Sequence, residues 1–176
     1  MADHRVTQGM ALAVLNAFGG AGRIIRRQDV SQFGAPADMD IKAAIRPFSN
    51  PNLPFNGRHY CAEDWHVILV AEIAGGDRSF TRQRAGEELD PITVTFELDG
   101  APLLGTERKA IKRFGDPEHF VQGWEEAYFF QEGRVMAPDE LAVGSHSLSF
   151  TAVGPDWQDQ DQITFFIDAA GEGACL

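Results

Sequence analysis

The sequence predicts a mainly β protein, an antiparallel sandwich of about seven strands preceded by an irregular N-terminal arm. Two observations lead to this fold class. Beyond about residue 57, segments in which apolar and polar residues alternate recur with turn residues between them, and helical periodicity is almost absent. The chain also shows no internal repeat and no alternation of strands with helices, which disfavours a Rossmann-type or barrel enzyme fold.

The composition is that of a globular domain that carries an excess of acidic residues. The chain has 176 residues, of which 44% are hydrophobic, and its thirteen Phe and three Trp can fill a core. With 26 acidic and 15 basic residues the net charge is −11, which argues against nucleic acid and membrane surfaces as partners. We expect a cytoplasmic protein, because no apolar run approaches the ~18 residues of a membrane helix. The apolar stretch 10–18 also lacks a clean signal-peptide cleavage site.

Residues 1–57 are predicted to form an arm that packs on the main domain or on a partner, and residues 58–176 to form the β-sandwich domain. Thr7 can cap one short helix that runs to Phe18, where two glycines would end it. The rest of the arm is irregular and closes in a turn-rich stretch of Pro, Asn and Gly over 47–57.

The first half of the domain contains one buried strand and one hairpin. Residues 65–73 are apolar on both faces, as in a central strand, and the polar stretch 75–90 is interpreted as a long loop. Apolar and polar residues alternate strictly over 92–98, which indicates a strand with one buried face. Asp99-Gly100 then predicts a tight turn into a returning strand that begins near Pro102.

The second half repeats this pattern. Strands are expected over 109–114 and 127–135, and alternation predicts further strands over 146–152 and 163–168. The polar residues 156–162 are interpreted as the loop before the last strand.

Two resemblances support the sandwich prediction. The segment 141–153, with its Leu-x-x-Gly-x-His-x-Leu pattern, and the segment 161–167 resemble the last two strands of bacterial immunoglobulin-like modules over about residues 90–168. This resemblance implies an immunoglobulin-like topology and says little about function. The hairpin strand 94–100 and the strand 141–148 are also similar, more faintly, to the small β-subunit of C-glycoside deglycosidases. That resemblance implies an accessory subunit beside a larger metal-dependent catalytic subunit, and it leaves residues 1–60 without a counterpart.

The densest polar cluster lies over 59–66. In an extended chain His59, Cys61 and Glu63 share one face, and Asp64 and His66 share the other. Imidazole, thiolate and carboxylate groups are good metal ligands, but three of them on one strand meet a metal at poor angles, so no metal is predicted. The favoured interpretation is a polar edge that leads into the core strand.

His146 lies just after a turn and is interpreted as a histidine bonded to turn backbone. It could act as a general base only with a carboxylate beside it. An enzyme or ligand-binding protein would therefore draw on a histidine and carboxylate pocket lined by Tyr60 or Trp65. The catalytic candidates for such a pocket are His59, Glu63, Asp64, His66 and His146.

Three further features carry alternatives. Trp124, Tyr128 and Trp157 are favoured as core residues but would form a carbohydrate-binding platform if their rings were exposed together. The basic run 107–113 is typical of a charged edge strand, and alternatively of a site for an acidic partner. Cys61 and Cys175 are interpreted as free thiols, with a bridge that ties the C-terminus to the domain as the alternative.

These observations favour a non-catalytic β-sandwich interaction module or an accessory subunit of a larger complex. We expect a protein partner or a homo-oligomer, and no cofactor. The alternatives are a small enzyme or ligand-binding protein that uses a histidine and carboxylate pocket, or a carbohydrate-binding module.

Overall fold

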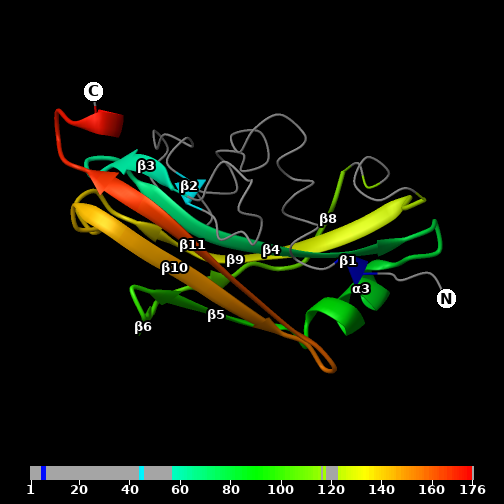
Figure 1. Ribbon diagram of the computed structural model, residues 1–176. Coiled ribbons are helices and arrows are strands. Elements are labelled where there is room, and N and C mark those ends of the chain that lie inside the picture. The colour runs from blue at the N-terminus through cyan, green and yellow to red at the C-terminus, as the bar shows by residue number, and fades with distance from the viewer. Residues whose placement is uncertain (1–4, 7–43, 46–56, 116, 118–122, 176) are drawn as a thin grey trace.

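The computed structural model describes residues 5–6, 44–45, 57–115, 117 and 123–175, and it is mainly β. In Figure 1 the strands form two layers, and the helix α3 lies at one end of them. The helix expected over 7–18, and the rest of the predicted arm apart from two short strands, fall outside the described residues. The described elements are β1 (Arg5–Val6), β2 (Ala44–Ile45), β3 (Arg58–Cys61), β4 (His66–Gly76), α3 (Arg82–Leu89), β5 (Thr93–Leu98), β6 (Ala101–Pro102), β7 (Glu107–Arg108), β8 (Lys112–Arg113), β9 (Glu126–Met136), β10 (Gly144–Val153), β11 (Gln158–Asp168) and the 3-10 helix η4 (Gly173–Cys175).

The first sheet, here called sheet A, is built around the antiparallel pair β4 and β9. Their register runs from His66 opposite Met136 to Gly76 opposite Glu126. β1 and β2 pair with β4, and β7 and β8 pair with β9. Every residue of β4 is buried, which confirms the predicted strand that is apolar on both faces.

The second sheet, sheet B, has the strand order β3-β11-β10-β5-β6. β10 and β11 form a long antiparallel hairpin, and β3 adds to β11 in parallel. The predicted turn between β5 and β6 is confirmed. Asp99 and Gly100 there have φ angles of 53° and 76°, and two successive positive φ angles are what a two-residue hairpin turn requires.

One hydrophobic core joins the inner faces of both sheets. Its largest fully buried side chains include Phe130 from sheet A and Phe150 and Phe165 from sheet B. Ala85 and Leu89 of α3 belong to the same core, so the helix closes one end of the space between the sheets. The burial of each large apolar side chain in this core, such as Phe130 or Leu89, contributes about 1.5–3 kcal/mol to the stability of the fold.

The helix α3 corrects the loop that the sequence analysis expected over 75–90. β4 extends to Gly76, and the helix then begins after Thr81, whose side chain accepts a hydrogen bond from the amide of Arg84 as an N-cap. The buried residues Ala85 and Leu89 are four positions apart and therefore lie on one face. Among the described residues no helix is long and apolar enough to cross a membrane.

Two further predictions are corrected along the same chain. β11 begins at Gln158, so most of the loop expected over 156–162 is strand, and the hairpin turn is shorter than predicted. Of the strand expected over 109–114, only Lys112–Arg113 (β8) is a strand, and a second short strand, β7, lies just before the predicted range.

The prediction of two free thiols is also wrong, because Cys61 and Cys175 form a disulfide. The bond joins the end of β3 to η4, which lies after the last strand. The side chain of Asp168 supports the same connection by accepting a hydrogen bond from the amide of Ala174. The pairing was open in the sequence because 114 residues separate the two cysteines.

Candidate functional site

The segment 59–66 does not form the two-faced strand considered from the sequence. β3 ends at Cys61, and residues 62–64 turn so that the amide of Asp64 donates to the carbonyl of Cys61 over 3.2 Å. Glu63 and Asp64 are exposed on this turn, whereas His66 is fully buried at the start of β4. Within the described part of the chain, no group of three or more His, Cys, Asp or Glu residues is placed to hold a metal ion.

His59 lies on the outer side of sheet B. Its ring stacks on Phe166 with 4.7 Å between the ring centroids, and its Nδ1 is 2.8 Å from Oδ1 of Asp168. Because Asp168 also holds the amide of Ala174, this histidine belongs to the clamp on the C-terminal turn. Its contacts are structural and do not include Glu63 or Asp64.

His146 is the predicted candidate that does meet a carboxylate. Its Nδ1 lies 2.7 Å from Oδ2 of Asp99, and its Nε2 lies 2.7 Å from the carbonyl of Ala142. Asp99 also accepts a hydrogen bond of 2.9 Å from the amide of Ser147, and the His146 ring stacks on Phe165. Both ring nitrogens face acceptors, so neither offers a free lone pair to a substrate.

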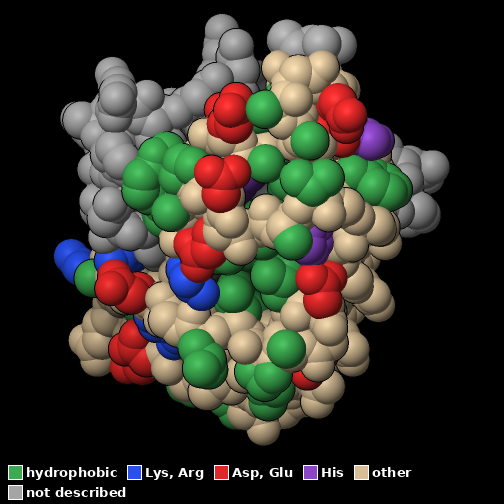
Figure 2. Space-filling view, turned by 90° about the vertical axis from the view of Figure 1, so that its left-hand side faces the viewer, with side chains coloured by type: hydrophobic (Ala, Val, Ile, Leu, Met, Phe, Trp, Pro, Cys, Tyr) green, Lys and Arg blue, Asp and Glu red, His purple; other side chains and the backbone are tan. Residues whose placement is uncertain are grey.

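Sequence reasoning missed Asp99 as the partner of His146. Asp99 was assigned only to the hairpin turn, and the register of β5 on β10, with Leu98 opposite Leu148, brings that turn beside His146. Figure 2 looks onto the end of the molecule that lies at the left in Figure 1. Histidine side chains there lie next to acidic ones, and acidic groups are spread among small hydrophobic groups.

The Asp99 carboxylate makes the hairpin end of sheet B sensitive to acid. Partial burial raises the pKa of Asp99. The hydrogen bonds from Ser147 and His146 and the charge of the His146 ring lower it, and together they outweigh the effect of burial, so the pKa lies below the ordinary 3.8. A carboxyl group with a lowered pKa stabilises the fold above its unfolded pKa, and this stability is lost as the pH falls through the folded pKa.

We therefore expect Asp99→Asn to remove a part of the acid sensitivity below about pH 4. Asn tolerates the positive φ angle and can still accept from Ser147, so the turn itself should survive. Because the Asp99 side chain is 49% exposed, the expected loss of stability at pH 7 is modest, about 1 kcal/mol or less. Urea midpoints of both proteins from pH 3 to pH 7 test this, and a constant difference between them across that range would contradict it.

The aromatic candidates do not share one exposed platform. Trp124 is buried against Ile73 and Ala127, whereas Tyr128 and Trp157 are half-buried and pack on the main core. Trp65 is half-buried in the connection before β4. This arrangement gives a flat sugar ring no row of coplanar rings to stack on.

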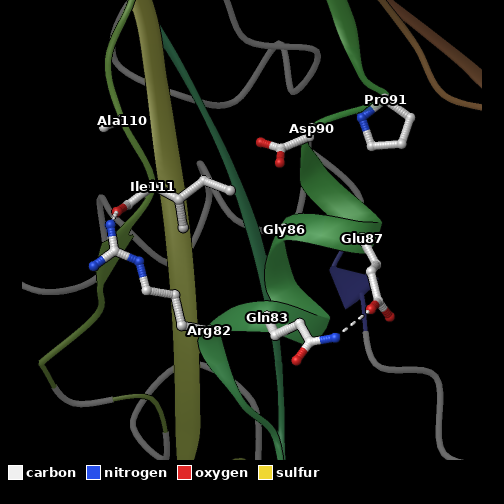
Figure 3. Close-up of a pocket in the computed structure, with 8 residues that line it drawn as sticks. All are labelled: Arg82, Gln83, Gly86, Glu87, Asp90, Pro91, Ala110 and Ile111. Atoms are coloured by element: carbon white, nitrogen blue, oxygen red, sulfur yellow. Dashed lines mark hydrogen bonds between the residues drawn. The ribbon is translucent and has the colours of Figure 1, made fainter.

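A shallow hollow of about 640 Å³ lies between α3 and the segment before β8 (Figure 3). Arg82 reaches from the helix and donates to the carbonyl of Ile111 over 2.8 Å, and Gln83 donates to Glu87 along the helix. The hollow contains carboxylates and one guanidinium, and its lining residues include no histidine, cysteine or hydroxyl side chain, so it offers no imidazole base and no thiol or hydroxyl nucleophile. It is lined by Arg82, Gln83, Gly86, Glu87, Asp90, Pro91, Ala110 and Ile111.

The outer side of strands β5, β10 and β11 in sheet B is rich in neutral polar side chains, and we call it the polar face. Hydroxyl and amide side chains dominate it, and Glu97 and Asp168, near opposite edges, are its charged members. Charged residues make up 23% of the whole chain, so this face is poorer in charge than the chain as a whole. The polar face comprises Thr93, Thr95, Glu97, Ser145, Ser147, Ser149, Thr151, Val153, Gln158, Gln160, Gln162, Thr164, Phe166 and Asp168.

No protein-family model matches the chain, and no curated protein sequence matches it either.

Proposed function

We propose that this chain is a non-catalytic, immunoglobulin-like β-sandwich module that binds another protein, as an interaction domain or as an accessory subunit of a larger complex. The observation that carries the proposal is the polar face of sheet B. The face spans β5, β10 and β11, the three adjoining strands of one sheet, and it is built from short hydroxyl side chains and neutral amides.

The low charge of this face favours a protein partner. The whole chain carries a net charge of −11, so most of its surface repels another acidic protein. The centres of protein interfaces are depleted in charged residues, because a buried charge without a partner is costly. Hydroxyl and amide groups can exchange water for partner hydrogen bonds at little cost. The cross-strand bond from Gln162 to Ser147 shows that these groups are already aligned between strands.

The alternative of a small enzyme is supported less well. The histidine and carboxylate pairs that the structure contains use their polar atoms internally. Both nitrogens of His146 are bonded, and His59 joins the C-terminal clamp. A substrate would have to displace one of these bonds before the His146 ring could take its proton, and Nδ1 of His59 is held by the Asp168 carboxylate.

Isolation of the tagged chain from its native cells, followed by native mass measurement, tests the proposal. We expect a stoichiometric complex with another protein. Gln160→Lys combined with Thr95→Lys places two charges on the polar face and should reduce recovery of the partner at least tenfold, with an unchanged unfolding midpoint. Gln83→Lys on α3 is the matched control and should keep the partner, because this exposed side chain lies off the polar face.

Recovery of the wild-type chain without a second protein would overturn the accessory-subunit function. Equal recovery of the partner by the lysine variant and by the control would instead remove the polar face as its binding surface. The two results are distinguishable because the first concerns the wild-type chain alone.

The compartment follows from a different feature. The sequence predicts a cytoplasmic protein, and that stays a prediction. The bond between Cys61 and Cys175 argues instead for an oxidising compartment, because disulfides persist there and are rare in the cytosol. Alkylation of free thiols at the moment of cell lysis decides the question, since two labelled cysteines indicate a reducing compartment and none an oxidising one.

A further inference from the structure

The corner between β3 and β4 is held by several backbone connections. Its residue Ala62 donates to the carbonyl of Asp168 over 3.0 Å and accepts from the amide of Asp139 over 2.8 Å. Cys61 adds the disulfide to Cys175. The corner therefore ties together both sheets' ends, the loop after β9 and the C-terminal turn.

His66 follows this corner in the sequence, as the first residue of β4, and its side chain is buried beneath the corner. The side chain is fully buried, and neither of its ring nitrogens makes a hydrogen bond. Tyr60 of β3 meets the ring edge-on, with 6.1 Å between centroids, and Met136 of β9 is its uncharged neighbour across sheet A. Phe165 of β11 lies behind Tyr60. A neutral imidazole fits these surroundings better than a charged one does.

Only one charged group described near the ring favours its protonated form. The Asp64 carboxylate acts on His66 from the turn, but Asp64 is exposed and its field is weakened by water. Tyr60 contributes a neutral phenol, and β9 and β11 contribute Met136 and Phe165, which are apolar. The carbonyl of Cys61 acts electrostatically on the ring without forming a full hydrogen bond to it.

We propose that His66 makes the β3–β4 corner acid-sensitive: the corner packs tightly around the neutral ring and loosens when the ring takes up a proton. A charged imidazolium in this position would have only the poorly aligned Cys61 carbonyl as an acceptor and would lose its hydration. The corner must then open enough to admit water. Because the disulfide stays closed, the opening is local and leaves Cys61 joined to the C-terminal turn.

The direction of the pH effect follows from the environment of the ring. Burial lowers the pKa of His66 from its ordinary value of 6.5, against the opposing effects of Asp64 and the Cys61 carbonyl. The unfolded chain therefore binds a proton at a higher pH than the folded chain does. Stability is complete above the unfolded pKa and falls as the pH drops below 6.5 towards the folded pKa.

The pH dependence of unfolding in the purified, oxidised chain tests this proposal. For wild type we expect the unfolding equilibrium constant to rise by up to about tenfold per pH unit between pH 6.5 and pH 5. His66→Phe keeps an aromatic ring and removes the titrating group, so its midpoint should stay flat over that interval. His59→Phe, the same change at an exposed histidine, should retain the fall.

Local opening has its own readout in the rate at which a phosphine reductant cleaves the disulfide. This rate should increase several-fold in wild type between pH 7 and pH 5.5, relative to His66→Phe at the same pH. If His66→Phe does not fold, ring-proton NMR of wild type decides the matter, because the proposal requires that the pKa of His66 in the folded chain lies below 6.5. Equal pH profiles for wild type and His66→Phe, or a His66 that titrates near 6.5, would overturn the proposal.

Discussion

Gly133→Ala is expected to destabilise the domain by about 3 kcal/mol, because a methyl group at this position has no space. Gly133 lies in β9 at the centre of sheet A, opposite Leu69 of β4 on one side and Glu107 of β7 on the other. A Cβ atom there would lie 2.1 Å from the carbonyl oxygen of Ile68 and 3.0 Å from the Cα atom of Leu69.

The backbone nature of these neighbours makes the effect large. A clash with a flexible side chain is relieved by rotation, but the Ile68 carbonyl is fixed in the β4–β9 pairing. The two strands must separate or β9 must shift, and either change disturbs the register that places Phe130 in the core. The φ angle of Gly133 is not in the left-handed region, so the effect comes from close approach and not from backbone conformation.

Gly115→Ala is the matched control. A Cβ atom at Gly115 meets nothing within 4 Å, and its φ angle is also outside the left-handed region. We expect this variant to be neutral or to gain about 0.4–1 kcal/mol from the lower entropy of its unfolded chain. Urea unfolding of the three proteins at pH 7 measures the difference. A Gly133→Ala midpoint equal to that of wild type would show that β4 and β9 do not pair in this register.

The same glycine illustrates what the sequence could predict. Strict alternation located β5 and β10, and the continuous apolar run located β4, because each pattern follows directly from one or two buried faces. Residues 127–135 were predicted as a strand in spite of Gly133, and a glycine inside a strand often marks the close approach of another backbone. Which backbone approaches depends on register between distant segments, and a single sequence does not contain that information.

The helix α3 shows why a short helix with a weak local signal can be overlooked. Its stretch reads as polar because most of its residues face solvent, and Gly86 lowers its helical propensity. Two features of the sequence indicate the helix: Thr81 as an N-cap, and Ala85 and Leu89 on one helical face. That face has only these two apolar residues, so no repeated apolar stripe marks the helix. A helix of two turns at the end of a core needs no more apolar surface than this.

The candidate site was predicted only in part because its partners come from distant segments. His146 was correctly placed after a turn, but its carboxylate comes from Asp99, 47 residues earlier. His66 was placed on one face with Asp64 on the assumption that 59–66 is extended, but the turn at 62–64 leaves Asp64 exposed and His66 is buried in the core. The polar face was visible as Thr, Ser and Gln at alternate positions, although only the strand order of sheet B joins these positions into one surface.

Removal of the disulfide is expected to have the largest effect on stability, about 4–5 kcal/mol in the chain-entropy account. The bond closes a loop with a sequence separation of 114 residues, so it restricts nearly the whole domain in the unfolded state. In the folded state it also holds η4 against β3, and the Cys175 side chain packs beside the carbonyl of Asp168. A loss of this size is a large fraction of the stability of an ordinary domain.

The double variant Cys61→Ser with Cys175→Ser, compared with oxidised wild type by urea unfolding at pH 7, measures this loss. Addition of a phosphine reductant provides the internal control, because it should lower the wild-type midpoint to nearly that of the double variant and leave the double variant unchanged. Asp168→Asn tests the contacts around the disulfide separately. The disulfide stays closed and one side-chain oxygen remains for the Ala174 amide, but the carboxylate that faces His59 is lost. If reduction leaves the wild-type midpoint where it was, the two cysteines do not constrain the unfolded chain, and the stability of the C-terminal turn must rest on Asp168, His59 and the surrounding backbone bonds alone.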